Sequence, residues 1–156
     1  MTASQGFQRT GWSADVQAAV AQLTAATGLQ LVSAGTFATT SSIPAGTDIT
    51  ISWVPSLSGG DTVGLTTFYY INSPAYTPQM VGANIQVLQT VRAGAGQNGE
   101  LPILLHELGH AVGLGHTPGQ PEIMNPYVQP DSTYQPGDLN GLRAVGSGGG
   151  CSGFYK

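Results

Sequence analysis

Three histidines in the segment 106–116 are the strongest chemical signal in this sequence. His106 and His110 are four residues apart, so on a helix both imidazoles lie on one face and can bind one metal ion. Glu107 follows His106, close enough to the same face for its carboxylate to reach a metal-bound water. Gly113 permits a backbone conformation that a Cβ resists, which lets the chain leave the helix and return His116 as third ligand. Three neutral imidazoles with one open position describe a catalytic zinc centre.

A competing interpretation is a buried helix whose histidines only form hydrogen bonds. All three histidines of the chain lie inside this stretch, so none is left over as an ordinary core or surface residue. The length of the pattern therefore favours the metal site over hydrogen-bonded histidines.

A methionine, Met124, follows eight residues after His116. With it the chain resembles the metzincin zinc endopeptidases, whose signature is the long histidine motif followed by a Met-turn. The form HELGHAVGLGH followed by IMNP is most similar to the matrixin branch and its small bacterial relatives. The resemblance implies one catalytic Zn²⁺ bound by His106, His110 and His116, above an apolar floor at Met124 that does not bind the ion.

The resemblance also implies a reaction, the hydrolysis of peptide bonds. Zinc polarises the scissile carbonyl, and Glu107 takes the proton from the zinc-activated water as general base. The substrate is an extended peptide or protein that pairs with an exposed edge strand. Val63 and Leu65 on that strand, with Pro126 and Tyr127 after the Met-turn, are the predicted substrate-binding residues. The alternative is a non-catalytic peptide-binding module with a structural zinc, which has no use for a general base.

In metzincins the residue after the scissile bond enters a pocket between the zinc helix and the segment that follows the Met-turn. Here that segment, residues 125–130, carries no charge, and Leu105 and Leu108 are expected on the helix nearby. Because an unpaired buried charge is costly, we predict apolar or aromatic residues at this substrate position. Tyr127 stands three residues after Met124, an offset that favours a role in the pocket wall over contact with zinc.

Length and charge limit the classes of function. The chain has 156 residues, which predicts one domain. Charged residues make up 8% of it, against about a quarter in typical domains, and the formal net charge is −4. With so few cations, neither nucleic acid nor an anionic membrane surface is expected as a partner. No apolar run approaches the length of a membrane span, and we expect a monomer.

The N-terminal residues 1–10 lack the basic-then-apolar pattern of a secretory signal. Metzincins are usually secreted, so the resemblance implies an extracellular enzyme whose leader is not in this chain. Cys151 is the single cysteine and can form no internal disulfide. It is a free thiol in a loose tail, a partner for a cysteine on another segment, or a zinc-blocking thiol; the sequence leaves all three open.

Other metal sites have weaker support. Matrixins often hold structural calcium, and many carry a second zinc bound by histidines. Because the chain has no histidine outside the motif, the second zinc site is expected to be missing in its usual form. No run of acidic residues has the density of a calcium loop, but Ca²⁺ bound by Asp61, Glu100 or Asp131 with backbone carbonyls is left open.

Several elements must position these residues. Apolar residues at helical spacing predict a helix from Ser13 to Thr27, and a second helix, with Pro102 in its first turn, carries the metal ligands. Strands are predicted at 29–32, 49–53, 63–70 and 83–87, with loops at 35–47, 72–78 and 92–99, and a last helix between Gly137 and Gly146.

The predicted fold class is α+β: a metzincin-like twisted mixed sheet with an exposed antiparallel edge strand, packed against a backing helix and the zinc-binding helix, plus a C-terminal helix. Residues 1–12 form an N-terminal segment, 13–146 the catalytic domain and 147–156 a Gly-rich tail. Matrixins usually begin with a strand before the first helix, and residues 1–12 supply little for one.

Overall fold

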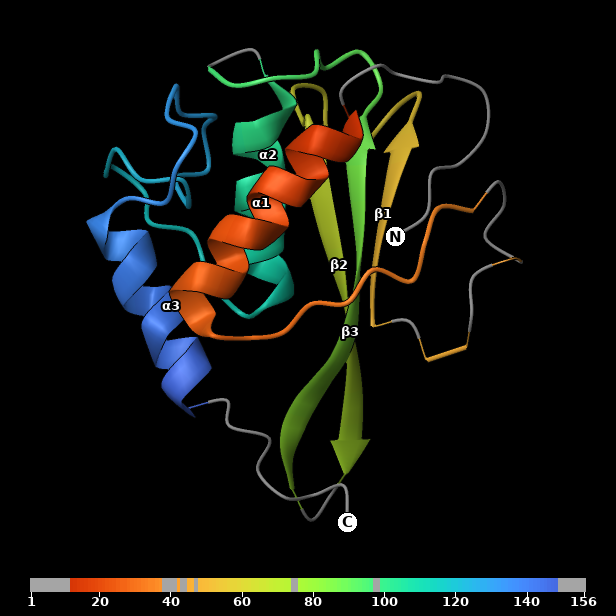
Figure 1. Cartoon of the computed structure of the whole chain (residues 1–156), viewed down its shortest axis with the longest axis vertical. Coiled ribbons are helices and arrows are strands. Elements are labelled where there is room, and N and C mark those ends of the chain that lie inside the picture. Colours follow the sequence, from red (N-terminus) through yellow and green to blue (C-terminus); the bar gives the residue numbers. More distant parts are fainter. Residues whose placement is uncertain are drawn as a thin grey trace.

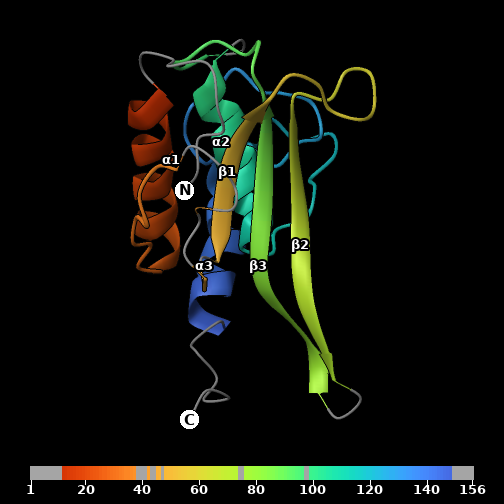
Figure 2. The same ribbon diagram turned by 90° about the vertical axis from the view of Figure 1, so that its right-hand side faces the viewer.

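The computed structural model describes residues 12–37, 42, 45–46, 48–73, 76–96 and 99–148. Its elements are, in chain order, α1 (Trp12–Thr27), β1 (Ile49–Val54), β2 (Gly64–Ser73), β3 (Tyr76–Leu88), α2 (Glu100–Ala111) and α3 (Pro136–Gly148). The three strands form one mixed sheet with the helices gathered on one side of it (Figure 1, Figure 2). The fold is α+β and consistent with the metzincin arrangement, as the sequence predicts.

The strand β3 lies at the centre of the sheet, whose order is β1-β3-β2. β1 runs parallel to β3, with Ile51 opposite Ile85, and β2 runs antiparallel, with Thr66 opposite Ile85. Ala83, Ile85 and Val87 alternate along β3 and are all buried, which is the period of a strand with one face on the core. β2 is therefore an antiparallel edge strand, as predicted.

The helix α2 packs against β2, β3 and α1, and α3 packs against α1. The inner face of α2 is leucine-rich and buried, because apolar residues recur there at helical spacing. The buried apolar residues of the helices include Val16, Ala19, Leu23, Leu101, Leu104, Leu105, Leu108 and Leu142. This packing fixes α2 rigidly against the sheet and leaves its other face for the histidines.

The predicted strand at residues 29–32 does not form, since residues 28–37 contain neither helix nor strand. Leu31 packs against the core, whereas Val32 is 90% exposed. No described strand pairs with this segment, since the described sheet consists of β1, β3 and β2 alone. Apolar composition alone does not make this segment a strand, because strand formation depends on pairing with a neighbour.

The predicted loop at residues 72–78 is also wrong. β2 continues to Ser73 and β3 starts at Tyr76, and these two residues pair with each other. Figure 2 shows the resulting hairpin extending well beyond the helices. The turn residues that predict a long loop mark a short reversal instead, because the residues on either side continue the antiparallel ladder.

Two helix ends differ slightly from the prediction. α1 begins at Trp12 rather than Ser13, and α3 runs to Gly148 rather than ending at Gly146. A Cβ on Gly146 would overlap the Thr27 carbonyl, so this glycine allows α3 to approach the end of α1 instead of terminating the helix.

Residues 1–11, and the end of the tail with Cys151, lie outside the described residues, and the division into three segments stays a prediction. In the part of the chain that the structure describes, no helix is both long and apolar enough to cross a bilayer.

Candidate metal centre

The three predicted histidine ligands converge on one point. His106 and His110 lie one turn apart on α2, and His116 lies in the loop that follows it. The Nε2 atom of His110 is 3.0 Å from that of His106 and 3.1 Å from that of His116, and the remaining Nε2 pair is 3.3 Å apart. In a tetrahedral zinc site with Zn–N distances of about 2.0–2.1 Å, the nitrogen ligands are about 3.3 Å apart. The spacing therefore fits a single zinc ion.

The second ring nitrogens identify the tautomers of two of these histidines. Nδ1 of His106 is 2.7 Å from the Ile123 carbonyl, and Nδ1 of His110 is 2.8 Å from the Leu114 carbonyl. Because a carbonyl oxygen can only accept, both Nδ1 atoms carry the proton and both Nε2 atoms present lone pairs. Two lone pairs cannot form a hydrogen bond with each other, so the close approach of His106 and His110 is the arrangement of metal ligands.

Burial keeps these two imidazoles neutral. It lowers the pKa of His106 to about 4, and it also lowers the pKa of His110. Metal ions bind the neutral ring, so the site holds His106 and His110 in the form that can ligate across the physiological range of pH.

The turn after α2 brings His116 into place. Gly113 has a φ of 105°, in the left-handed region where a side chain is strained. Its N–H donates to the His110 carbonyl at 2.7 Å, and the Leu114 N–H donates to the Gly109 carbonyl at 3.0 Å. These two bonds are the Schellman pattern, which reverses the chain at a helix end. Gly113 thus lets the chain leave α2 and return His116 toward the other two histidines, as the sequence predicts.

Glu107 lies beside the histidines with 4% of its surface exposed. The hydroxyl of Thr66, on β2, is 2.5 Å from Glu107 Oε2 and 3.1 Å from the Glu107 carbonyl oxygen. Burial raises the pKa of Glu107 to about 7, although the Thr66 hydrogen bond opposes the increase. Gly64, two residues earlier on β2, packs so closely that a Cβ there would come within 3.0 Å of the carboxylate. Neither Thr66 nor Gly64 is identified by the sequence patterns.

The Met-turn lies directly beneath α2. Met124 is 1% exposed, and its sulfur packs so tightly against Gly109 that a Cβ at that position would overlap it. The Thr117 N–H donates to the Met124 carbonyl at 2.9 Å and closes the loop. Met124 therefore packs beneath α2, where Gly109 makes room for it, and its role as the floor of a zinc site stays a prediction.

Two acidic residues join the Met-turn to α3. Asp138 accepts the backbone N–H groups of Ile123 and Met124, at 2.8 and 3.1 Å. In return, Glu122 accepts the N–H groups of Gly137 and Asp138, at 3.0 and 2.7 Å, and so caps the N-terminus of α3. The sequence does not predict this contact, whose single local signal is a carboxylate in the first turn of a helix.

One cleft of about 560 Å³ contains all the predicted site residues except the buried Met124. The histidines and Glu107 lie on its α2 side; Val63 and Leu65 line the β2 side, and Pro126 and Tyr127 line the side after the Met-turn. Tyr127 is 79% exposed and stands at the rim. Leu105 and Leu108, which were expected near the pocket, face the core, and Pro102 and Ile103 line the cleft instead. Pro102 and Ile103 lie one turn before His106 and Glu107, so they share the cleft-facing side of the helix.

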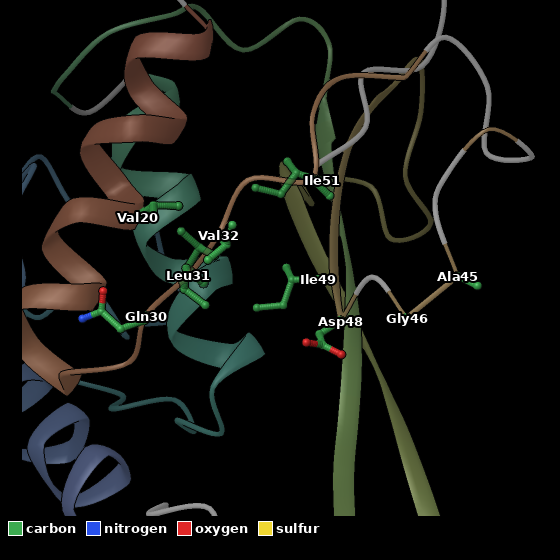
Figure 3. A pocket seen from close by; sticks show the side chains of 11 residues that line it. Val20, Gln30, Leu31, Val32, Ala45, Gly46, Asp48, Ile49 and Ile51 are labelled. Carbon is green, nitrogen blue, oxygen red and sulfur yellow. The ribbon is translucent and has the colours of Figure 1, made fainter.

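A separate cavity of about 430 Å³ lies between α1 and β1 (Figure 3). Val20 and Leu31 line it on one side and Ile49 on the other, with Asp48 near its edge. It includes no histidine and none of the chemistry-bearing residues described above, so it is not part of the metal site.

Among the described residues, the three histidines form the one group of three or more side chains that could hold a metal ion. The acidic residues considered for calcium are not gathered in this way. Glu100 is fully buried and accepts the indole N–H of Trp53, whereas Asp61 is exposed at the edge of the cleft. Calcium binding by these residues stays a prediction.

Fold and site together define a metallopeptidase that acts on peptides or proteins. A family model described as matrixin (Peptidase_M10) matches residues 4–145, and a comparison with curated proteins gives no match. Because the matched region covers most of the chain, the protein belongs to the matrixin family. Membership implies zinc, and His106, His110 and His116 supply a site for one ion.

Proposed function

We propose that the chain is a zinc-dependent endopeptidase in which Glu107 is the general base. The observation that carries this proposal is a buried carboxylate beside three converging imidazoles in one open cleft. Zinc bound by the histidines supplies Lewis-acid chemistry, which polarises a carbonyl oxygen and makes a water molecule more acidic. A purely structural metal site has no need of a neighbouring carboxylate, so Glu107 favours the enzyme over a non-catalytic module.

In this mechanism Glu107 moves one proton in two stages. Its carboxylate takes a proton from the attacking water as the new carbon–oxygen bond forms at the scissile carbonyl. The resulting carboxylic acid then gives that proton to the leaving amine nitrogen as the carbon–nitrogen bond breaks. The Thr66 hydroxyl is bonded to Oε2, which supports Oε1 as the oxygen that meets the water.

The substrate we propose is an extended peptide segment of a protein, lying along the cleft. β2 is an edge strand, and its residues Gly64, Leu65 and Thr66 line the cleft, so backbone pairing with β2 can satisfy the polar groups of the substrate. We also propose that the enzyme is secreted and acts as a monomer, in keeping with the usual extracellular location of matrixins.

Cleavage of a denatured protein, with and without a zinc chelator, tests the proposed reaction. The wild-type chain should show cleavage that the chelator abolishes and added zinc restores. Glu107→Ala should keep its fold and its zinc but lose nearly all cleavage. Because it is purified in the same way as the wild type, it also controls for a contaminating protease. Undiminished cleavage by Glu107→Ala, or none by the zinc-loaded wild type, would overturn the proposal and favour the binding module.

Metal content is a separate test. We expect one tightly held zinc per chain after the protein is stripped with chelator, reloaded and desalted, because the described residues offer one such group of ligands. His110→Ala should reduce this content to well below one. Two or more tightly held zinc ions would show that the second matrixin zinc site is present in another form.

A further inference from the structure

Thr66 stands where the substrate-binding strand meets the general base. It lies on β2 between Gly64 and Phe68, and because side chains alternate along a strand, these three residues share one face. All three contact the metal centre: Gly64 packs against the Glu107 carboxylate, the Thr66 hydroxyl bonds to it, and the Phe68 ring meets the His110 ring edge-on at 6.5 Å between centroids.

The Thr66 hydroxyl is the one hydrogen-bond donor to the Glu107 carboxylate among the residues that the structure describes. Its distance of 2.5 Å from Oε2 is at the short end of the range for a hydroxyl bonded to an ionised acid. A glutamate side chain has several rotatable bonds, so a single short bond at one oxygen fixes the direction in which the other oxygen points. Oε1 lies beside Gly64, where even a Cβ would overlap it, and is the oxygen left without the Thr66 bond.

We propose that Thr66 is a positioning residue for catalysis: its hydroxyl holds Glu107 Oε2 so that Oε1 faces the attacking water. This inference rests on the proposed function of Glu107. It also links two parts of the mechanism, because the same residue that holds the base belongs to the strand along which the substrate pairs. Loss of the hydroxyl leaves the substrate contacts in place but lets the carboxylate turn. The turnover number kcat should therefore decrease, whereas the Michaelis constant KM should stay unchanged.

The test compares three substitutions in the zinc-loaded protein with one peptide substrate. Thr66→Val keeps the side-chain shape and removes the hydroxyl, and it should lower kcat about tenfold to a hundredfold with KM within about twofold, as expected for a misaligned base. Thr66→Ser keeps the hydroxyl and should retain kcat within about threefold. Thr50→Val is the matched control, since Thr50 lies on the opposite edge strand and its hydroxyl bonds to Asn84, away from the cleft; its kcat should stay within about twofold of wild type.

The outcomes separate this inference from the proposed function. If the wild type cleaves, Glu107→Ala does not, and Thr66→Val keeps its full kcat, then Thr66 does not position the base while the enzyme assignment stands. Equal losses in Thr66→Ser and Thr66→Val would also overturn the inference, because the cause would then be packing. Zinc content should be equal in all variants, since the hydroxyl of Thr66 bonds to Glu107 and not to a histidine. If Thr66→Val does not fold, Thr66→Ala replaces it.

A measurement without activity tests the same contact. The melting temperatures of Thr66→Val, Glu107→Ala and the double variant form a cycle in the metal-free protein. If the hydroxyl and the carboxylate interact as the geometry indicates, the double variant should lose clearly less than the sum of the two single losses. Strictly additive losses would show that the contact is not made, even if the chain proved to have no peptidase activity.

Discussion

Asp138 and His106 are joined through a single peptide group. The N–H of Met124 donates to Asp138 Oδ1 at 3.1 Å, and the carbonyl on the same peptide, that of Ile123, accepts Nδ1–H of His106 at 2.7 Å. A residue on α3 thus orients a peptide that in turn fixes the tautomer and direction of a metal ligand on α2. Outer contacts of this kind tune metal affinity as well as holding the ligand in place.

Asp138→Asn should therefore weaken zinc binding by about tenfold to a hundredfold, because the amide cannot accept both N–H groups as a carboxylate does. Zinc affinity measured by competition with a chromogenic chelator checks this. Glu122→Gln is the control: it loosens the cap of α3 in the same region but leaves the Asp138–Met124 contact in place. Equal affinity losses in the two variants would show that the effect comes from general loosening of α3.

Gly109→Ala should destabilise the fold by about 1–3 kcal/mol, the usual cost of overpacking. The added Cβ would overlap the Met124 sulfur beneath α2, and Met124 is too buried to move aside freely. Gly115→Ala is the matched control, since Gly115 has open space around it and no positive φ. Urea unfolding measures both. An unchanged free energy of unfolding in Gly109→Ala would mean that the Met-turn is farther from α2 than described.

The sequence predicts where the histidines and Glu107 lie in the fold, because their spacing is local. The helical period places His106, Glu107 and His110 correctly, and Gly113 with His116 follows from the geometry of a helix end. The residues it misses act across long sequence separations. Thr66 is 41 residues from Glu107, and nothing in the pattern of β2 distinguishes it from Thr67.

The errors in the fold have a similar cause. Strand formation depends on a neighbour, so the apolar segment 29–32 does not become a strand without one, whereas β2 and β3 lengthen each other through the turn between Ser73 and Tyr76. Leu105 and Leu108, which were expected near the pocket, belong instead to the face of α2 that packs on the core. Periodicity defines an apolar face, but the packing of α1 and the sheet decides which part of it is enclosed.

The metal-free protein should show a pH-dependent cost of burying Glu107. Burial raises its pKa to about 7, so between pH 4.5 and 7 the folded chain holds a proton that the unfolded chain has released. Stability is then lost as the pH rises through this window. His106, whose pKa burial lowers to about 4, has the opposite effect, because its unfolded form binds a proton first as the pH falls below 6.5. The two contributions oppose each other in the wild type.

Glu107→Gln separates them, since it removes the glutamate contribution and leaves that of His106. The free energy of unfolding of Glu107→Gln, minus that of the wild type, should increase between pH 4.5 and 7, by at most about 1.4 kcal/mol per pH unit. Urea unfolding in the presence of chelator at several pH values provides the measurement. A difference that stays constant across this range would mean that Glu107 titrates as an exposed glutamate.

Substrate preference follows from the chemistry of the cleft wall. Ile103, Pro126 and Val128 line it, and the two carboxylates among its lining residues are Glu107, which serves the reaction, and Asp61, which is exposed. The described residues that line the cleft include no lysine or arginine, so among them an acidic side chain after the scissile bond finds no partner, and a basic one finds only the screened charge of Asp61. Burying such a charge unpaired costs more than about 1.4 kcal/mol, a factor of ten, so peptides with charged residues there should be cleaved more than tenfold less efficiently than those with apolar or aromatic ones.

Cleavage-site mapping in a peptide library measures this preference, and Asp61→Asn checks whether any remaining preference for basic residues comes from Asp61. A dominant Asp, Glu, Lys or Arg at that position in the wild type would place the pocket wall elsewhere.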